Sequence, residues 1–169
     1  IGKSGQSKGS NDTANLGSPA DINVDTAAKE VYVADGYRNR RVIVFDTETG
    51  AYKRHWGAYG KPPSDEKTPA YDPAKPPAQQ FGRPVHCVRF SKDGLVYVCD
   101  RTNDRVQIFK KDGAFVKEAF FEKNTRLNGS VSELVFSPDR DQKFIYMVDG
   151  VNNELRVIDR ASLETLARI

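Results

Sequence analysis

Few side chains in this sequence are of the types that bind transition metals or act as strong nucleophiles. The only two cysteines are Cys87 and Cys99, and the only two histidines are His55 and His86. Two cysteines exclude both a disulfide framework and a Cys-rich structural zinc site. Any metal chemistry of these residues therefore depends on the histidines and on the elements that position them.

The composition is that of a turn-rich globular protein of one domain. The 169 residues include 38% hydrophobic and 29% charged residues, with 13 glycines and 9 prolines. This mixture is too apolar for a disordered chain, and no apolar run approaches the ~20 residues of a membrane-spanning helix. The formal net charge is only +3, less than proteins that bind nucleic acid through phosphate contacts usually carry. We therefore expect neither a nucleic-acid partner nor a membrane span.

Three segments of the chain, residues 18–57, 83–121 and 130–169, can be aligned with one another. Each contains an apolar run that ends in an aspartate, an asparagine three or four residues later, and a second apolar run. The aspartates and asparagines are Asp35, Asp100, Asp149, Asn39, Asn103 and Asn152. Repeats of about forty residues built from short strands indicate a β-propeller, in which each repeat forms one blade.

The second segment predicts the four strands of such a blade. Runs rich in Val, Ile, Tyr and Phe occupy residues 86–90, 95–99, 105–109 and 114–121, with Gly, Asp and Asn between them. No segment shows a helical period. We predict an all-β propeller of four-stranded antiparallel blades. The repeated Asp and Asn would shape the corner between the second and third strands through hydrogen bonds to nearby backbone.

Two stretches depart from the repeat. Residues 58–82 contain six of the nine prolines and predict a Pro-rich loop between blades, which Tyr59 and Tyr71 fold back onto the surface. Residues 1–17 resemble the tail of a preceding blade or a linker. Three blades do not close a ring, so we expect about half of a six-bladed propeller. The remaining blades would come from further sequence, which we favour, or from a second copy.

Strand alternation brings three polar side chains to one end of the blades. The first two strands of a blade run antiparallel, so the start of the first lies at the same end as the end of the second. His86 opens the first strand of its blade, which is the strand nearest the central channel. Tyr37 and Arg101 follow the aspartates that close second strands, so all three side chains should face the same rim. His55 falls in an outer, fourth strand.

The same geometry places Cys87 and Cys99 nearly opposite each other on the first two strands of the second blade. A cross-strand disulfide and two small thiols packed between sheets both fit this placement. We expect the packed thiols.

The pattern P-x-D-I-x-V-D…V-Y-V-A-D-G-Y-x-N-x-R-V-x-V-F resembles the NHL-repeat β-propellers, and the resemblance covers nearly the whole chain. Three stretches, ADGYRNRRV (34–42), FGRPVHCV (81–88) and CDRTNDRVQIF (99–109), look most like one branch of that family. This branch is the lyase domain of the peptide-amidating enzymes, peptidyl-α-hydroxyglycine α-amidating lyase. The chain also resembles secreted bacterial NHL proteins, which implies a secreted or periplasmic location.

The resemblance implies a role for each rim residue. His86 stands where the family places one of three histidine ligands of a channel zinc ion, which leaves a position open for substrate. Tyr37 matches a catalytic tyrosine that takes a proton from the substrate hydroxyl, and Arg101 matches an arginine that binds the substrate carboxylate. The implied reaction cleaves a peptidyl-α-hydroxyglycine into a peptide amide and glyoxylate. A calcium ion with ligands outside this segment is implied as well.

Other interpretations of the same residues stay open. His86 fits a strand-end histidine bonded to a backbone carbonyl, Tyr37 a packed turn aromatic, and Arg101 a surface cation paired with an aspartate. The whole chain also fits a non-catalytic propeller that binds a small peptide-like, protein or glycan ligand on its rim. The basic cluster at residues 38–41 suggests RNA binding, but acidic residues at related turns make the charge mixed, and we do not expect it.

Overall fold

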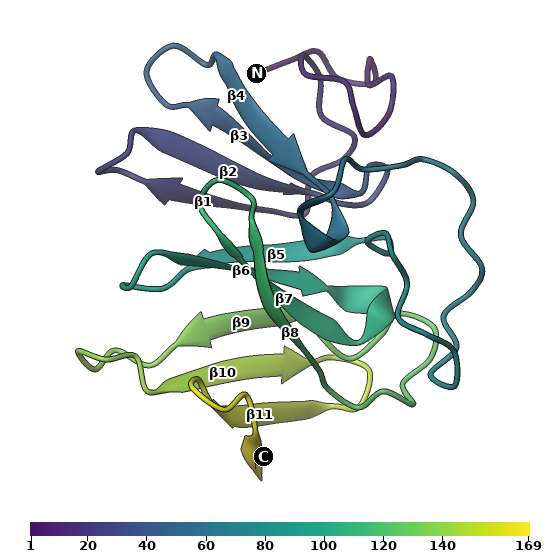
Figure 1. Ribbon diagram of the computed structural model, residues 1–169, viewed down its shortest axis with the longest axis vertical. Coiled ribbons are helices and arrows are strands. Elements are labelled where there is room, and N and C mark those ends of the chain that lie inside the picture. The colour runs from purple at the N-terminus through teal and green to yellow at the C-terminus, as the bar shows by residue number, and fades with distance from the viewer.

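The computed structural model describes residues 1–169 and contains three four-stranded antiparallel sheets, placed one after another along the long axis (Figure 1). The first contains β1 (Asp21–Asp25), β2 (Glu30–Asp35), β3 (Arg41–Asp46) and β4 (Tyr52–Trp56). The second contains β5 (Val85–Phe90), β6 (Leu95–Asp100), β7 (Arg105–Lys110) and β8 (Phe115–Phe120). The third contains β9 (Glu133–Phe136), β10 (Phe144–Asp149), β11 (Glu154–Asp159) and β12 (Thr165–Arg168). The predicted all-β fold of four-stranded antiparallel blades is confirmed.

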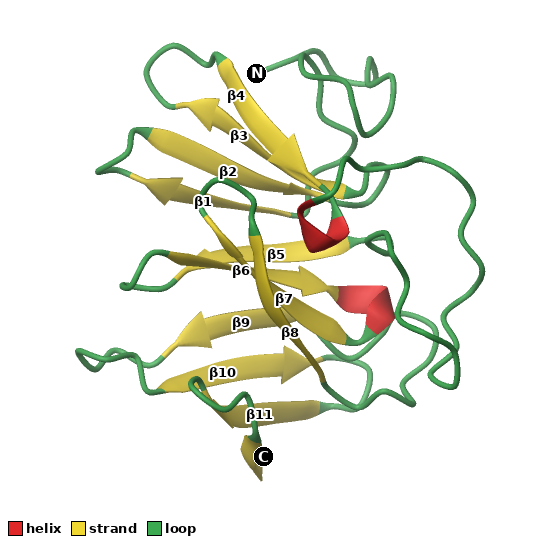
Figure 2. Cartoon of the chain, viewed as in Figure 1, coloured by secondary structure: helices red, strands yellow, loops and turns green.

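Helical structure is confined to two short 3-10 turns, Ala58–Gly60 and Arg101–Asn103, drawn red in Figure 2. The structure has no helix with the length and apolar character that a membrane crossing needs. In the second blade the strands lie where the sequence predicts them, except that the fourth is shorter. The amide of Lys110 donates to the carbonyl oxygen of Ala114 at 2.8 Å, and this turn delays β8 to Phe115.

Two hydrophobic cores fill the spaces between neighbouring sheets. The strands alternate, so one face of the second sheet packs on the first and its other face packs on the third. Val96 and Val98 of β6 belong to the core shared with the first blade, whereas Tyr97 and Ile108 belong to the core shared with the third. Fully burying side chains of this size contributes about 1.5–3 kcal/mol each, so the blades are held together mainly by apolar packing.

The first strands of the three blades lie next to one another and are joined by charge. The carboxylate of Asp21 on β1 accepts a hydrogen bond from the amide of Val88 at 2.9 Å and pairs with the guanidinium of Arg89, both on β5. Arg89 also lies 2.9 Å from Glu133 on β9. Neighbouring first strands are what a propeller requires around its central channel.

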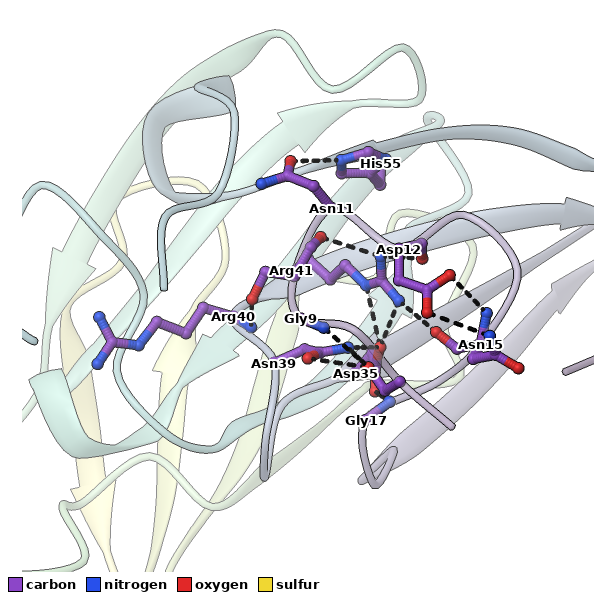
Figure 3. Close-up of polar contacts among 12 residues, drawn as sticks. Gly9, Asn11, Asp12, Asn15, Gly17, Asp35, Asn39, Arg40, Arg41 and His55 are labelled. Atoms are coloured by element: carbon purple, nitrogen blue, oxygen red, sulfur yellow. Dashed lines mark hydrogen bonds and ion pairs between the residues drawn. The ribbon is translucent and has the colours of Figure 1, made fainter. Parts of the chain in front are cut away.

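Each blade turns its second corner around a buried ion pair. Figure 3 shows the corner of the first blade. In the first blade, the carboxylate of Asp35 accepts hydrogen bonds from the Gly17 amide at 2.8 Å, the Asn39 side chain at 2.7 Å and Nε of Arg41 at 2.9 Å. The equivalent groups in the other blades are Asp100 with Asn103 and Arg105, and Asp149 with Asn152 and Arg156. The predicted structural role of the Asp and Asn is confirmed, and the arginine is the third member of each corner.

The arginines also bind the chain that leads into each blade. The guanidinium of Arg41 donates to the carbonyl oxygens of Ser10, Asp12 and Asn15 at 2.6–2.9 Å. Arg105 donates in the same way to Ala78 at 2.9 Å. The N-terminal segment therefore packs onto the first blade as the end of the Pro-rich loop packs onto the second.

The two tyrosines of the Pro-rich loop anchor it to the second blade, as expected. The hydroxyl of Tyr59 donates to Glu118 at 3.0 Å and accepts from Arg105 at 2.8 Å. The hydroxyl of Tyr71 donates to the carbonyl oxygen of Lys123 at 2.9 Å. The loop thus runs along the blades at their corner end (Figure 1).

Candidate functional site

His86 sits on a bulge at the start of β5. The register of β5 against β6 shifts between Val85 and Cys87, so His86 is an extra residue in the strand. Ala20 and Ser132 hold the matching positions in the other blades, where the pairing of the first two strands shows no shift. A bulge re-aims a side chain, and here it turns a half-buried imidazole toward the third blade.

The hydrogen bonds of His86 identify its tautomer. Nδ1 lies 2.7 Å from the carbonyl oxygen of Ser132, which only accepts, so Nδ1 carries the proton and Nε2 presents its lone pair. Burial lowers the pKa of His86, and the charge of Arg101 acts in the same direction, outweighing the Ser132 hydrogen bond. His86 is therefore a neutral imidazole at pH 7 with Nε2 available as an acceptor or ligand.

Tyr37 meets His86 across the boundary between the first and second blades. Its hydroxyl lies 3.3 Å from Nε2, which makes the hydroxyl the donor, and the ring centroids are 6.0 Å apart. The preceding Gly36 allows this approach, because a Cβ there would overlap the backbone of Val85. Tyr37 remains 50% exposed, so it is not a packed turn aromatic.

Arg101 lies at the end of β6, in the 3-10 turn that follows Asp100. It is half-buried and makes no ion pair, unlike the arginine of each blade corner, and its Nε is buried without a hydrogen-bond partner. Its charge acts on His86. The structure therefore gathers His86, Tyr37 and Arg101 at one rim, and it leaves the guanidinium of Arg101 available to an anionic ligand.

Cys87 and Cys99 form a disulfide, and our expectation of free packed thiols is wrong. The bulge at His86 places Cys87 directly opposite Cys99, with Cα atoms 4.8 Å apart, and this separation suits a cross-strand bond. The two sulfurs and Glu133 are the only cluster of three metal-ligating side chains in the structure. Because the sulfurs are bonded to each other, this cluster offers no thiolate to a metal.

His55 lies on β4, away from this rim. Its Nδ1 is 2.8 Å from the hydroxyl of Tyr52, and its Nε2 is 3.2 Å from Oδ1 of Asn11 (Figure 3). Both nitrogens thus have polar partners. Of the two histidines, only His86 lies at the rim with Tyr37 and Arg101.

Comparison with known proteins adds the family. The family model described as "Lactonase, 7-bladed beta-propeller" matches residues 2–168. The chain belongs to this family. Its three sheets are blades of the Lactonase-family propeller, and the matched residues span all of them. The family description names seven blades, so our figure of six for the whole ring stays a prediction.

The amidating enzymes are relatives of this Lactonase-family chain. Peptidyl-glycine alpha-amidating monooxygenase B of Xenopus laevis is 35% identical over 101 residues, which are 59% of this chain and 10% of that protein. Peptidyl-glycine alpha-amidating monooxygenase of Mus musculus is 28% identical over 133 residues, which are 78% of this chain and 12% of that protein. The chain thus spans about a tenth of the length of these relatives. The resemblance to the peptide-amidating branch is confirmed.

Solved structures show the fold alone. The structure of U3-55K has a TM-score of 0.64 at 14% identity, and the alignment covers 92% of this chain and 40% of the U3-55K chain. Hydrazine synthase of Kuenenia stuttgartiensis has a TM-score of 0.60 at 18% identity, and the alignment covers 97% of this chain and 39% of the synthase chain. Virginiamycin B lyase of Staphylococcus aureus has a TM-score of 0.54 at 15% identity, and the alignment covers 90% of this chain and 41% of the lyase chain. Proteins of different names therefore share this arrangement of blades.

Two parts of the site were not predicted from the sequence. A bond from His86 to a backbone carbonyl was one of the alternatives left open, but its partner, Ser132 of the next blade, was not predicted, because a backbone atom carries no signal in the residue type. Gly36 admits Tyr37, and its signal was present, because a glycine between Asp35 and an aromatic residue marks a close approach of backbone.

Proposed function

We propose that this propeller contributes one wall of a carbon–nitrogen lyase site that acts on a peptidyl-α-hydroxyglycine. His86 would ligate a zinc ion, Tyr37 would accept a proton and Arg101 would bind the substrate carboxylate. The observation that carries the proposal is the Tyr37–His86 pair, in which Nε2 faces the tyrosine hydroxyl and Ser132 holds Nδ1. The names of the relatives, which describe amidation of peptidyl-glycine, favour the same substrate class.

His86 fits one position of a zinc site. A zinc-ligating histidine usually donates its second ring N–H to a carboxylate or carbonyl oxygen, as Nδ1 does here to Ser132. Zinc needs three or four ligands, and residues 1–169 supply one at this rim, so the others would come from residues outside this range. A bound zinc ion would supply Lewis acidity that makes a substrate hydroxyl easier to deprotonate.

The remaining groups would divide the reaction between them. With zinc on Nε2 of His86, the hydroxyl of Tyr37 would no longer donate to that nitrogen. As a phenolate, Tyr37 would take the proton of the substrate hydroxyl while the C–N bond breaks and the new C=O bond forms, and it would pass that proton to the departing nitrogen. The departing amide nitrogen gains a proton, so the products are a peptide amide and glyoxylate, with no change in oxidation state. Arg101 holds the carboxylate that becomes part of glyoxylate, through paired N–H donors.

The test is a metal and product analysis of the intact protein, with His86→Gln compared against His55→Gln. We expect wild type and His55→Gln to retain bound zinc and to release glyoxylate from an α-hydroxyglycine peptide. His86→Gln should lose both, because its Nε2 ligand is gone. Wild-type protein that binds the peptide and leaves it uncut would instead establish a non-catalytic binding propeller. Equal zinc content in wild type and His86→Gln would remove His86 from the metal site.

A further inference from the structure

A cleft lies between the N-terminal segment and the corner of the first blade. Its volume is about 540 Å³. Most of the lining comes from the N-terminal segment, within residues 1–9 and 16–19, and the rest comes from Arg38, Asn39, Asp65 and Arg83. The lining is mostly polar, so the cleft is suited to a charged or hydrogen-bonding ligand.

The cleft is strongly cationic. Lys3, Lys8, Arg38 and Arg83 face it, against the single carboxylate of Asp65. Asp65 is already bonded to the amide and hydroxyl of Ser10 at 2.6 Å and to Arg83 at 3.3 Å. Four cations less one carboxylate leave +3, which equals the formal net charge of the whole chain. The lining of the cleft therefore carries a clear excess of positive charge.

Three of these cations have no acidic partner. Eleven of the 26 basic side chains form ion pairs, and Lys3, Lys8 and Arg38 are among the fifteen that do not. Unpaired cations that converge on a cleft attract anions and select ligands by charge. The missing counter-charge is what a ligand would bring.

Hydrogen bonds fix the backbone that forms the wall of the cleft. Ser10 binds Asp65, and its hydroxyl accepts a hydrogen bond from the amide of Arg40 at 2.9 Å. The carboxylate of Asp12 accepts from the amides of Lys8 and Ala14 at 2.9 Å. These bonds keep the pKa of Asp12 well below its usual range. The basic side chains thus project from a backbone that is already fixed.

The cleft and the rim site share one loop. Arg38 follows Tyr37 directly. The amide of Arg38 donates to the carbonyl oxygen of Gly17 at 2.8 Å, and the amide of Tyr37 donates to that of Ser18 at 3.2 Å. Gly17 and Ser18 both line the cleft. On the other side, Arg83 leads through Pro84 and Val85 to His86. Two short stretches of chain, residues 37–38 and 83–86, therefore connect the rim site with the cleft.

We propose that this cleft binds acidic residues of the peptide whose C-terminal end lies at Tyr37, His86 and Arg101. The inference rests on the proposed function, because it takes the rim site as the place of the peptide terminus. An acidic peptide supplies the several carboxylates that Lys3, Lys8 and Arg38 lack. The protein would then favour acidic sequences over neutral ones of the same length.

The test is fluorescence anisotropy with two labelled peptides that end in glycine and carry either three Glu or three Gln upstream. We expect the Glu peptide to bind the intact protein about tenfold or more tightly at low ionic strength, with the advantage shrinking as salt screens the charges. In the double variant Lys8→Gln/Arg38→Gln, the affinity for the Glu peptide should fall to the affinity for the Gln peptide. The control Lys29→Gln/Lys110→Gln removes two positive charges at the end of the blades away from the cleft. It should keep the preference for the Glu peptide.

Three outcomes would overturn the inference. One is equal affinity for the two peptides, and another is loss of the preference in the control variant. The third is binding of inorganic triphosphate that the Glu peptide does not displace, which would make the cleft a phosphate site. Lyase activity without an acidic preference would remove this inference alone. An acidic preference without any glyoxylate release would instead contradict the proposed function and leave the cleft as a peptide-binding site.

Discussion

The hydroxyl of Tyr37 in the first blade lies 3.3 Å from Nε2 of His86 in the second, while Nδ1 of the same ring lies 2.7 Å from the carbonyl of Ser132 in the third. Three consecutive blades thus each contribute one residue to a single line of hydrogen bonds. The position of this histidine depends on how the blades pack as well as on its own strand. A variant that loosens the packing between blades would therefore disturb the site from a distance.

Tyr37→Phe should separate chemistry from stability. It removes the hydroxyl that we propose as the proton acceptor, so glyoxylate release should fall by about 10²–10⁴-fold, the range for a positioned acid–base group. The ring is 50% exposed and loses a single hydrogen bond, so the free energy of unfolding should change by less than about 1.5 kcal/mol. Steady-state kinetics and urea unfolding measure the two effects.

The matched control for Tyr37→Phe is Tyr52→Phe, which removes the hydroxyl that contacts the other histidine, His55. It should leave glyoxylate release unchanged. If Tyr37→Phe keeps wild-type kcat, Tyr37 is not the proton acceptor, whatever the control does.

The parts of this structure that were predicted from sequence are those that repeat. Asp35, Asp100 and Asp149 each end a strand, and that regularity was enough to place the blades and the rim. The opposition of Cys87 and Cys99 was predicted, but the choice between a disulfide and two packed thiols was wrong, because it depends on the exact separation of the two strands, 4.8 Å between Cα atoms, which the bulge sets. A slip of one residue would have turned one sulfur to the other face of the sheet.

The cationic cleft was beyond sequence reasoning for a different reason. Its cations come from residues 3, 8, 38 and 83, which no repeat relates and which only the folding of the N-terminal segment over Arg41 brings together. The net charge of +3 carries no information on where the excess lies, so the sequence did not show that these cations meet.

Removing the disulfide should lower stability and leave the fold intact. Cys87→Ala/Cys99→Ala opens a loop with a sequence separation of 12, for which the loss of constraint on the unfolded chain is worth about 2–3 kcal/mol. Urea unfolding of the variant against wild type measures the change. The pairing itself is checked by mass spectrometry, in which alkylation of both cysteines should require unfolding together with a reductant. Alkylation of unreduced protein would show that the thiols are free.

Arg41→Met should be among the most destabilising single changes in the chain. It leaves the carboxylate of Asp35 fully buried without its counter-charge, and it frees three carbonyl oxygens of the N-terminal segment. Breaking a buried pair from one side costs about 3–5 kcal/mol. The control Lys29→Met breaks an exposed pair with Glu48 and should cost less than about 1 kcal/mol. Similar urea midpoints for the two variants would contradict this ranking.

Asp104 should make the protein less stable as the pH rises. Its side chain is fully buried, Oδ1 accepts from the amide of Ser130 at 2.7 Å, and Oδ2 has no partner. Burial raises the pKa of Asp104 from 3.8 to about 7. Between these two values the folded protein binds more protons at this site than the unfolded chain does. The contribution of Asp104 to the free energy of unfolding therefore falls as the pH rises through this window, and it is constant above about pH 7.

Asp104→Asn should abolish the fall in stability with rising pH, because the amide side chain stays neutral at every pH. The third blade already carries Asn153 at the matching position with the same left-handed backbone, φ 57° against 53° for Asp104, so the substitution adds no strain. We expect the variant to be more stable than wild type at pH 8 by about 1–3 kcal/mol, with the difference vanishing toward pH 4. Urea unfolding between pH 4 and pH 8 measures this, with the exposed Asp141→Asn as a control for the lost charge. Parallel curves for Asp104→Asn and wild type would mean that Asp104 is ionised throughout, and that its buried oxygen has a partner in solution.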